Sequence, residues 1–222
     1  MHEFENVFSA IFPFWPSLRE EEKQNLLSGT RAVDYAQGEV LHEGSSCAGL
    51  TIVCEGCIRV SILSEEGREI TLYRLERGDF CLLSASCVLE AVTFDVQFVA
   101  EKASRALILN AGAFSALAQA HPEVEIFALN KTVERFSDVM WVMQQILFRS
   151  LDCRLASFLV DESVRTQSDV LTLTHEDIAR NIASAREAVS RLLKYFEGEG
   201  LVALSRGKVT LLDKRALRAL AQ

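Results

Sequence analysis

In this 222-residue chain, the side chains best suited to hydrogen-bonding a partner are four polar residues at helical spacing. Arg186, Glu187, Ser190 and Arg191 would lie on one side of a helix, because residues three and four apart share a helix face. An arginine can donate two hydrogen bonds to guanine O6 and N7, and a glutamate can accept one from cytosine N4. The competing interpretation is a solvated face with internal pairs, such as Glu187 with Arg191.

Two short amphipathic helices would position these residues. Thr174 followed by Asp177 resembles a capping box, and Ser184 followed by Glu187 matches the full Ser-x-x-Glu pattern, so a helix is expected to begin at each. The core-facing positions would be Ile178, Ala179 and Ile182 in the first helix, and Val189, Leu192, Leu193 and Phe196 in the second. Two helices joined by a tight break predict a helix-turn-helix, whose second helix, here about 185–196, enters the DNA major groove.

A β-hairpin is predicted directly after the second helix. Gly198 and Gly200 would end the helix, and two β-prone runs, 201–204 and 208–212, flank a Ser-Arg-Gly turn at 205–207. A helix-turn-helix followed by a hairpin is a winged helix. The basic residues of the hairpin tip are suited to DNA phosphates.

The segment 174–193, with its Arg-Glu-x-x-Ser-Arg core, resembles the DNA-binding signature of the CRP/FNR family of bacterial transcription regulators. The resemblance implies a homodimer on a two-fold symmetric site in double-stranded DNA, with half-sites such as TGTGA or TTGAT roughly 34–36 Å apart. It also implies a small effector and contact with RNA polymerase. The expected DNA-binding set is Arg186, Glu187 and Arg191 for bases, Ser190, Arg206 and Lys208 for the backbone or a methyl group, and Thr174 and Ser184 at the helix starts.

The charge of the chain is unevenly distributed. The net charge is −8, yet residues 174–222 hold nine Lys and Arg against six Asp and Glu, a balance of +3, which leaves −11 for the remainder. The acidic residues 1–173 would repel non-specific DNA. Binding should therefore depend on how the protein is aligned on its DNA site as well as on charge. No run approaches the roughly 18 apolar residues of a membrane span, and the N-terminus lacks a basic signal region, so we expect a cytoplasmic protein without a membrane partner.

The first half of the chain predicts a β-rich domain. Residues 1–30 predict a short helical segment, with Ser17 and Glu20 as a further capping box. From residue 31 to about 111, short β-prone runs alternate with glycine turns, as in a sandwich or jelly roll. Three patterns resemble the cyclic-nucleotide-binding β-roll of the same family: Glu-Gly-x-Ile-Arg-Val at 55–60, Glu-Glu-Gly-Arg-Glu-Ile at 65–70 and Leu-x-x-Gly-Asp at 75–79.

A long helix is predicted over residues 122–151. Its apolar residues step alternately by four and three, which is the a/d pattern of a coiled coil and seldom so regular in a helix packed within one chain. In the family this helix is the dimer interface, and the residues expected to form it here are Leu129, Val133, Phe136, Met140, Met143 and Leu147. The expected fold is therefore α+β, with a jelly-roll β-roll sensor domain at 1–120, a dimerisation helix at 121–151 and a winged helix at 152–222.

The effector is unknown, and cyclic AMP is disfavoured. The family binds the nucleotide with a Gly-Glu pair for the ribose and a following Arg for the phosphate, just after the Gly-Asp-Phe motif. After Gly78-Asp79-Phe80 this pair is missing, and no Arg occurs between Arg77 and Arg105. A buried phosphate without a cation or a glycine cradle would be poorly compensated.

Six cysteines offer a replacement: Cys47, Cys54, Cys57, Cys81, Cys87 and Cys153. Cys81 and Cys87 occupy the segment that would bind the nucleotide, and a short helix beginning near Cys81 would favour a reactive thiolate. Cys54 and Cys57 flank a predicted two-residue hairpin turn, across which a disulfide could form. Thiol redox sensing is therefore the leading hypothesis for the effector, and buried thiols that fill an empty pocket are the equal alternative.

Metal cofactors have weaker support. Relatives with an iron–sulfur cluster carry cysteines before the β-roll, and this chain has none before Cys47, so that cluster is disfavoured. A single Cys-x-x-Cys gives little support for zinc, and no metal site is assigned. Haem stays possible because Cys and His can be axial ligands, although His42 has nothing around it that marks it as one.

Two other function classes compete with the DNA-binding regulator. One is a ligand- or redox-sensing module that acts through protein partners, with its winged helix used for contacts other than DNA. The other is an enzyme with Cys81 or Cys87 as nucleophile, which would need a nearby His base that the sequence does not identify. No nucleophile–base arrangement is visible, so we expect no catalysis.

Overall fold

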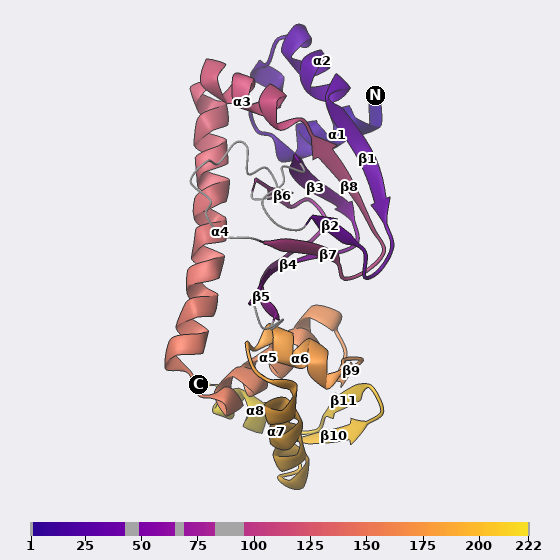
Figure 1. Ribbon diagram of the computed structural model, residues 1–222, viewed down its shortest axis with the longest axis vertical. Coiled ribbons are helices and arrows are strands. Elements are labelled where there is room, and N and C mark those ends of the chain that lie inside the picture. Colours follow the sequence, from indigo (N-terminus) through magenta and orange to yellow (C-terminus); the bar gives the residue numbers. More distant parts are fainter. Residues whose placement is uncertain (1, 43–48, 65–68, 83–95, 222) are drawn as a thin grey trace. The chain divides into compact units, whose positions relative to one another are not determined.

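The computed structural model describes residues 2–42, 49–64, 69–82 and 96–221, and the chain divides into two compact units (Figure 1). The β-roll unit comprises residues 1–63 and 72–139. The winged-helix unit comprises residues 64–71 and 140–222. The division falls within one long helix, α4.

The N-terminal segment folds as a helical preface on an aromatic core. It comprises α1 (His2–Ile11), a 3₁₀ turn (Trp15–Ser17) and α2 (Glu20–Ser28). The predicted capping box of Ser17 and Glu20 is wrong. Pro16 continues a 3₁₀ turn that includes Ser17, whose hydroxyl donates to the carbonyl of Phe14 (2.8 Å), so the extended N-cap position falls on Arg19.

Two four-stranded sheets form the β-roll. Their strands are β1 (Thr30–Tyr35), β2 (Val40–His42), β3 (Leu50–Glu55), β4 (Ile58–Leu63), β5 (Glu69–Leu75), β6 (Phe80–Cys81), β7 (Gln97–Ala100) and β8 (Ser104–Leu109). One sheet has the order β1-β8-β3-β6 and the other β2-β7-β4-β5. The predicted jelly-roll-like sandwich is thus confirmed.

The predicted hairpin at Glu55-Gly56 is wrong. β3 and β4 belong to different sheets, so Cys54 and Cys57 flank a crossover between sheets, and both are free thiols. Gly56 adopts φ +86° there, and a Cβ on it would lie 2.4 Å from the carbonyl oxygen of Ala103. A Glu-Gly pair indicates a tight turn, but it does not state which strands the turn joins.

Two helices follow the β-roll strands. α3 (Ala111–Ala120) is capped by Asn110, whose side chain accepts from the amide of Ala113 (2.9 Å), and α4 (Pro122–Phe148) extends as one long helix. The six predicted seam residues of α4 are 44–66% exposed in the single chain. No helix in the described part of the chain is both long and apolar enough to cross a membrane.

The winged-helix unit surrounds its own core. Its elements are α5 (Leu151–Thr166), β9 (Val170–Leu171), α6 (His175–Asn181), α7 (Arg186–Gly198), β10 (Val202–Ser205), β11 (Lys208–Leu211) and α8 (Lys214–Leu220), with sheet order β10-β11-β9. Leu155, Ile178, Val189, Leu193 and Phe196 are completely buried in this core. β9 and α8 were not predicted, because a two-residue strand and a seven-residue helix are too short to show a period.

Candidate nucleic-acid interface

The first helix of the helix-turn-helix begins at the predicted capping box. The Thr174 hydroxyl accepts from the amide of Asp177 (3.1 Å), and the Asp177 carboxylate accepts from the amide of Thr174 (2.9 Å). Two of the amides that lack an intrahelical partner at this end of α6 are thereby satisfied, and the predicted capping box of Thr174 and Asp177 is confirmed.

The turn between the helices differs from the prediction. Ala183 adopts the left-handed conformation (φ +51°), and the amide of Ser184 donates to the carbonyl of Ala179 (3.0 Å), which closes a Schellman motif on α6. Because the Ser184 amide is committed to α6, the chain becomes extended only at Ala185, which is the N-cap of α7. The predicted capping box of Ser184 and Glu187 is therefore wrong.

The recognition helix α7 separates its residues by face. Val189, Leu193 and Phe196 are fully buried, whereas Arg186, Glu187 and Arg191 are exposed and Ser190 is half-buried. Among the described residues, no ion pair joins Glu187 to Arg191, so the competing internal pair is not formed. The three charged side chains keep their hydrogen-bonding capacity for a partner.

A second Schellman motif ends α7 and starts the wing. Gly200 (φ +71°) donates to the carbonyl of Glu197 (3.0 Å), and the amide of Leu201 donates to Phe196 (2.9 Å). The hairpin pairs Ser205 with Lys208 around the two-residue turn Arg206-Gly207, with Gly207 at φ +69°. The predicted wing is confirmed, and it exposes Arg206 and Lys208 at its tip.

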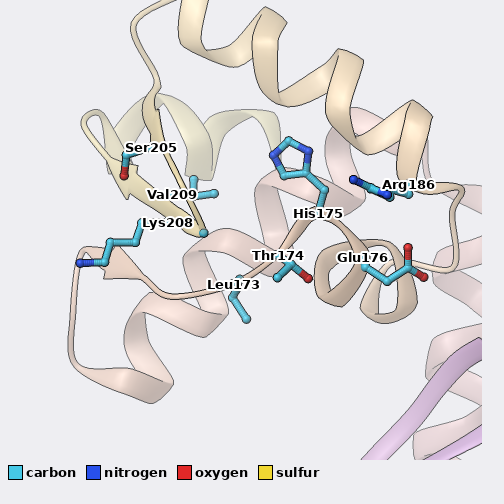
Figure 2. A pocket seen from close by; sticks show the side chains of 9 residues that line it. Leu173, Thr174, His175, Glu176, Arg186, Ser205, Lys208 and Val209 are labelled. Carbon is cyan, nitrogen blue, oxygen red and sulfur yellow. The ribbon is translucent and has the colours of Figure 1, made fainter.

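An open pocket of about 360 Å³ lies between α6, the start of α7 and the wing (Figure 2). It brings together Thr174, Arg186 and Lys208, which were predicted to bind DNA. It adds six residues that were not: Leu173, His175, Glu176, Ser205, Gly207 and Val209. Figure 2 shows Arg186 extending toward the His175 ring, while Lys208 points away from both.

Arg186, Ser205 and Lys208 are the side chains of this pocket suited to binding an anion, whereas Glu176 adds a negative charge to its lining. Arginine, lysine and hydroxyl groups are the side chains that bind phosphate oxygens in DNA complexes. Glu187, Ser190, Arg191 and Arg206 do not line the pocket. No local pattern marked His175 or Ser205, because only the tertiary fold brings the wing beside the start of α6.

Cys57 and Cys81 are poorly placed for reactivity. Cys81 is completely buried in strand β6, its sulfur 3.7 Å from the Tyr73 hydroxyl. A helix beginning near Cys81 would extend into residues 83–95, which lie outside the described residues. Burial, together with the nearby Glu101 carboxylate, raises the pKa of Cys57 to about 12. Cys54 is half-buried, and Cys47 and Cys87 lie outside the described residues.

Comparisons with known proteins agree with this architecture. Residues 32–121 match the family model of the cyclic nucleotide-binding domain, and residues 153–220 match the Crp-like helix-turn-helix domain. The transcriptional regulator LdrP of Thermus thermophilus is 30% identical over 189 residues, 82% of this chain and 93% of LdrP. The HTH-type transcriptional regulator Cmr of Mycobacterium tuberculosis is 24% identical over 211 residues, 92% of this chain and 82% of Cmr.

A solved structure has a similar fold. The crystal structure of a transcriptional regulator of the crp/fnr family from Eubacterium rectale has a TM-score of 0.91 and 41% identity, covering 96% of this chain and 99% of that one. These relatives are transcription regulators and not enzymes. With a β-roll that matches the cyclic nucleotide-binding domain and a Crp-like helix-turn-helix domain, the chain belongs to the CRP/FNR family of transcription regulators.

Proposed function

We propose that this regulator reads a two-fold symmetric DNA site as a homodimer, with α7 in the major groove. The observation that carries the proposal is the exposed face of α7, on which Arg186, Glu187 and Arg191 form no ion pair with any described residue. Arg186 and Arg191 would bind guanine edges, and Glu187 would accept from cytosine. The adjoining pocket would receive a backbone phosphate through Ser205 and Lys208 of the wing.

The dimer is supported by the seam of α4. Six large apolar side chains at a regular 3.5-residue period stay exposed in the single chain, and burying such surface stabilises by roughly 25 cal/mol per Å². A second copy with the same seam would cover them. Two recognition helices related by the dimer axis would then meet half-sites roughly 34–36 Å apart.

The effector proposal is a small ligand of the β-roll other than cyclic AMP. It is supported by the absence of the Gly-Glu pair and phosphate-binding Arg from the sequence after Gly78-Asp79-Phe80. The segment that would hold the ligand, residues 83–95, lies outside the described residues. RNA polymerase contact stays an expectation from the family.

Thiol redox sensing is the second candidate for the effector. Burial of Cys57 and Cys81 argues against a reactive thiolate at either position. The hypothesis therefore rests on Cys54, which is half-buried, and on Cys87. Regulation through protein partners instead of DNA is the remaining alternative.

Selection of genomic DNA fragments by the purified protein tests these proposals, run in parallel with thiols reduced and oxidised. We expect a palindrome in both states. A palindrome recovered in only one state would establish the thiols as the switch. The variant Arg186→Ala/Arg191→Ala is the matched control, because it should keep the dimer but recover no motif. Wild-type protein that enriches no motif in either state would mean either that the effector is missing or that the winged helix is not used on DNA, which is the protein-partner alternative.

A further inference from the structure

A single arginine of α5 contacts the turn of the helix-turn-helix. The Arg154 guanidinium donates through Nη1 to the carbonyl of Ile182 (2.5 Å) and, at 3.4 Å, to the carbonyl of Ala183. These residues are the C-cap of α6 and the left-handed residue that follows it. Carbonyls at a helix C-terminus have no partner within the helix, and a cation there is favourable.

Among the described residues, these two carbonyls are the hydrogen-bond partners of the Arg154 guanidinium. No carboxylate pairs with it among the residues that the structure describes, and its Nε is buried without a hydrogen-bond partner. Burial lowers the pKa of this guanidinium, so its position disfavours the charged form. An apolar residue would fill the site at lower cost unless the bonds to the turn are needed.

These hydrogen bonds hold the turn between α6 and α7, and the turn sets the orientation of the recognition helix. Ile182 and Ala183, whose carbonyls accept these bonds, belong to the turn between the end of α6 and the N-cap of α7 at Ala185. Ala183 adopts the left-handed conformation, which is unfavourable for a residue with a Cβ, and the bonds from Arg154 add to the Schellman bond that holds this turn. Arg154 supplies these bonds from the adjacent helix.

We infer that Arg154 is a positioning residue for DNA reading: by bonding the turn from α5, it fixes the orientation in which α7 presents Arg186, Glu187 and Arg191. The inference rests on the proposed reading of DNA by α7. Arg154 itself would not contact DNA. Its loss should therefore lower discrimination between sequences while leaving non-specific affinity unchanged.

The test uses the full chain and the palindrome recovered by selection. For each protein, Kd is measured for that site, for single base-pair variants of it and for random DNA, over a range of salt concentrations. Arg154→Met keeps the apolar stem and removes the donors. We expect the ratio of specific to non-specific affinity to fall about tenfold, with an unchanged salt slope, because the phosphate contacts remain.

Two further variants separate positioning from stability. Leu217→Ala opens the same core from α8, where Leu217 is fully buried, without touching the turn. It should lower Tm yet keep discrimination. Arg154→Lys keeps a charge but loses the guanidinium fork, and should reduce discrimination about threefold; should Arg154→Met fail to fold, this variant decides.

Each outcome has a definite meaning. Wild-type discrimination in Arg154→Met, or in Arg154→Lys where that variant decides, would overturn the inference. An equal loss of discrimination in Leu217→Ala would do so as well, as would a salt slope reduced by about one, which indicates a direct phosphate contact. A wild-type protein without sequence preference would instead reject the proposed function itself.

Discussion

The exposed arginines of the winged-helix unit are expected to play different roles. Arg191 lies on the recognition helix and Arg206 at the wing tip, and both are exposed. Arg191→Ala should weaken binding to the selected site by roughly 1–3 kcal/mol and relax one base position, because a bidentate contact is lost. Arg206→Ala should weaken binding to all sequences alike and reduce the salt slope by about one. Competition binding against single base-pair variants measures both, and unchanged specificity in Arg191→Ala would remove its assignment.

The thiol of Cys57 is expected to be inert near neutral pH. Burial and Glu101 raise its pKa to about 12 from an ordinary value of 9. Below pH 9 the thiol is protonated in both the folded and unfolded states. As pH rises from 9 toward 12, only the unfolded state loses the proton, so this group makes the fold progressively less stable.

Alkylation followed by peptide mass mapping checks this expectation. Iodoacetamide at pH 7.5 should leave Cys57 unmodified in the native protein and modify it in urea, whereas the half-buried Cys54 should react earlier. The stability loss between pH 9 and 12 should be smaller in Cys57→Ala. Rapid native alkylation of Cys57 at pH 7.5 would refute the assignment and revive the redox hypothesis.

At the scale of an element, the end of α7 depends on backbone conformation. Gly200 adopts φ +71°, while Gly198 is the last residue of the helix, and a Cβ at either position would meet no atom within 4 Å. Gly200→Ala should lower the free energy of unfolding by roughly 1–2 kcal/mol, because the left-handed region is costly for alanine. Gly198→Ala should raise it by roughly 0.5–1 kcal/mol through helix propensity. Urea titration of both variants isolates the conformational effect, and equal changes would contradict it.

At the scale of the whole molecule, the seam of α4 should decide the oligomeric state. Phe136 lies on the seam and Trp141 off it, and they are 63% and 55% exposed. Phe136→Glu would place two carboxylates in the apolar interface of a dimer and should give monomers with much weaker affinity for the palindrome. Trp141→Glu, the same kind of change outside the seam, should leave the dimer intact. Sedimentation velocity distinguishes the two, and a dimeric Phe136→Glu would exclude this seam as the interface.

The sequence alone determined the elements with a strong local signal. The capping box at Thr174, the apolar period of α7, the glycine at position 200 and the Ser-Arg-Gly turn of the wing each specify local geometry through a few neighbouring residues. The heptad pattern likewise marked α4 and its exposed seam. Short-range hydrogen bonding and side-chain periodicity are sufficient for such features.

Only the tertiary structure decided how these elements connect and which groups they bring together. Ser184 matched a capping pattern, yet its amide bonds to Ala179, so the cap moved to Ala185. Cys54 and Cys57 matched a hairpin, yet their strands lie in different sheets. Arg154 is 28 residues from Ile182 in sequence, and only the packing of α5 on α6 joins them. A local pattern cannot specify such contacts, because they depend on where distant segments pack.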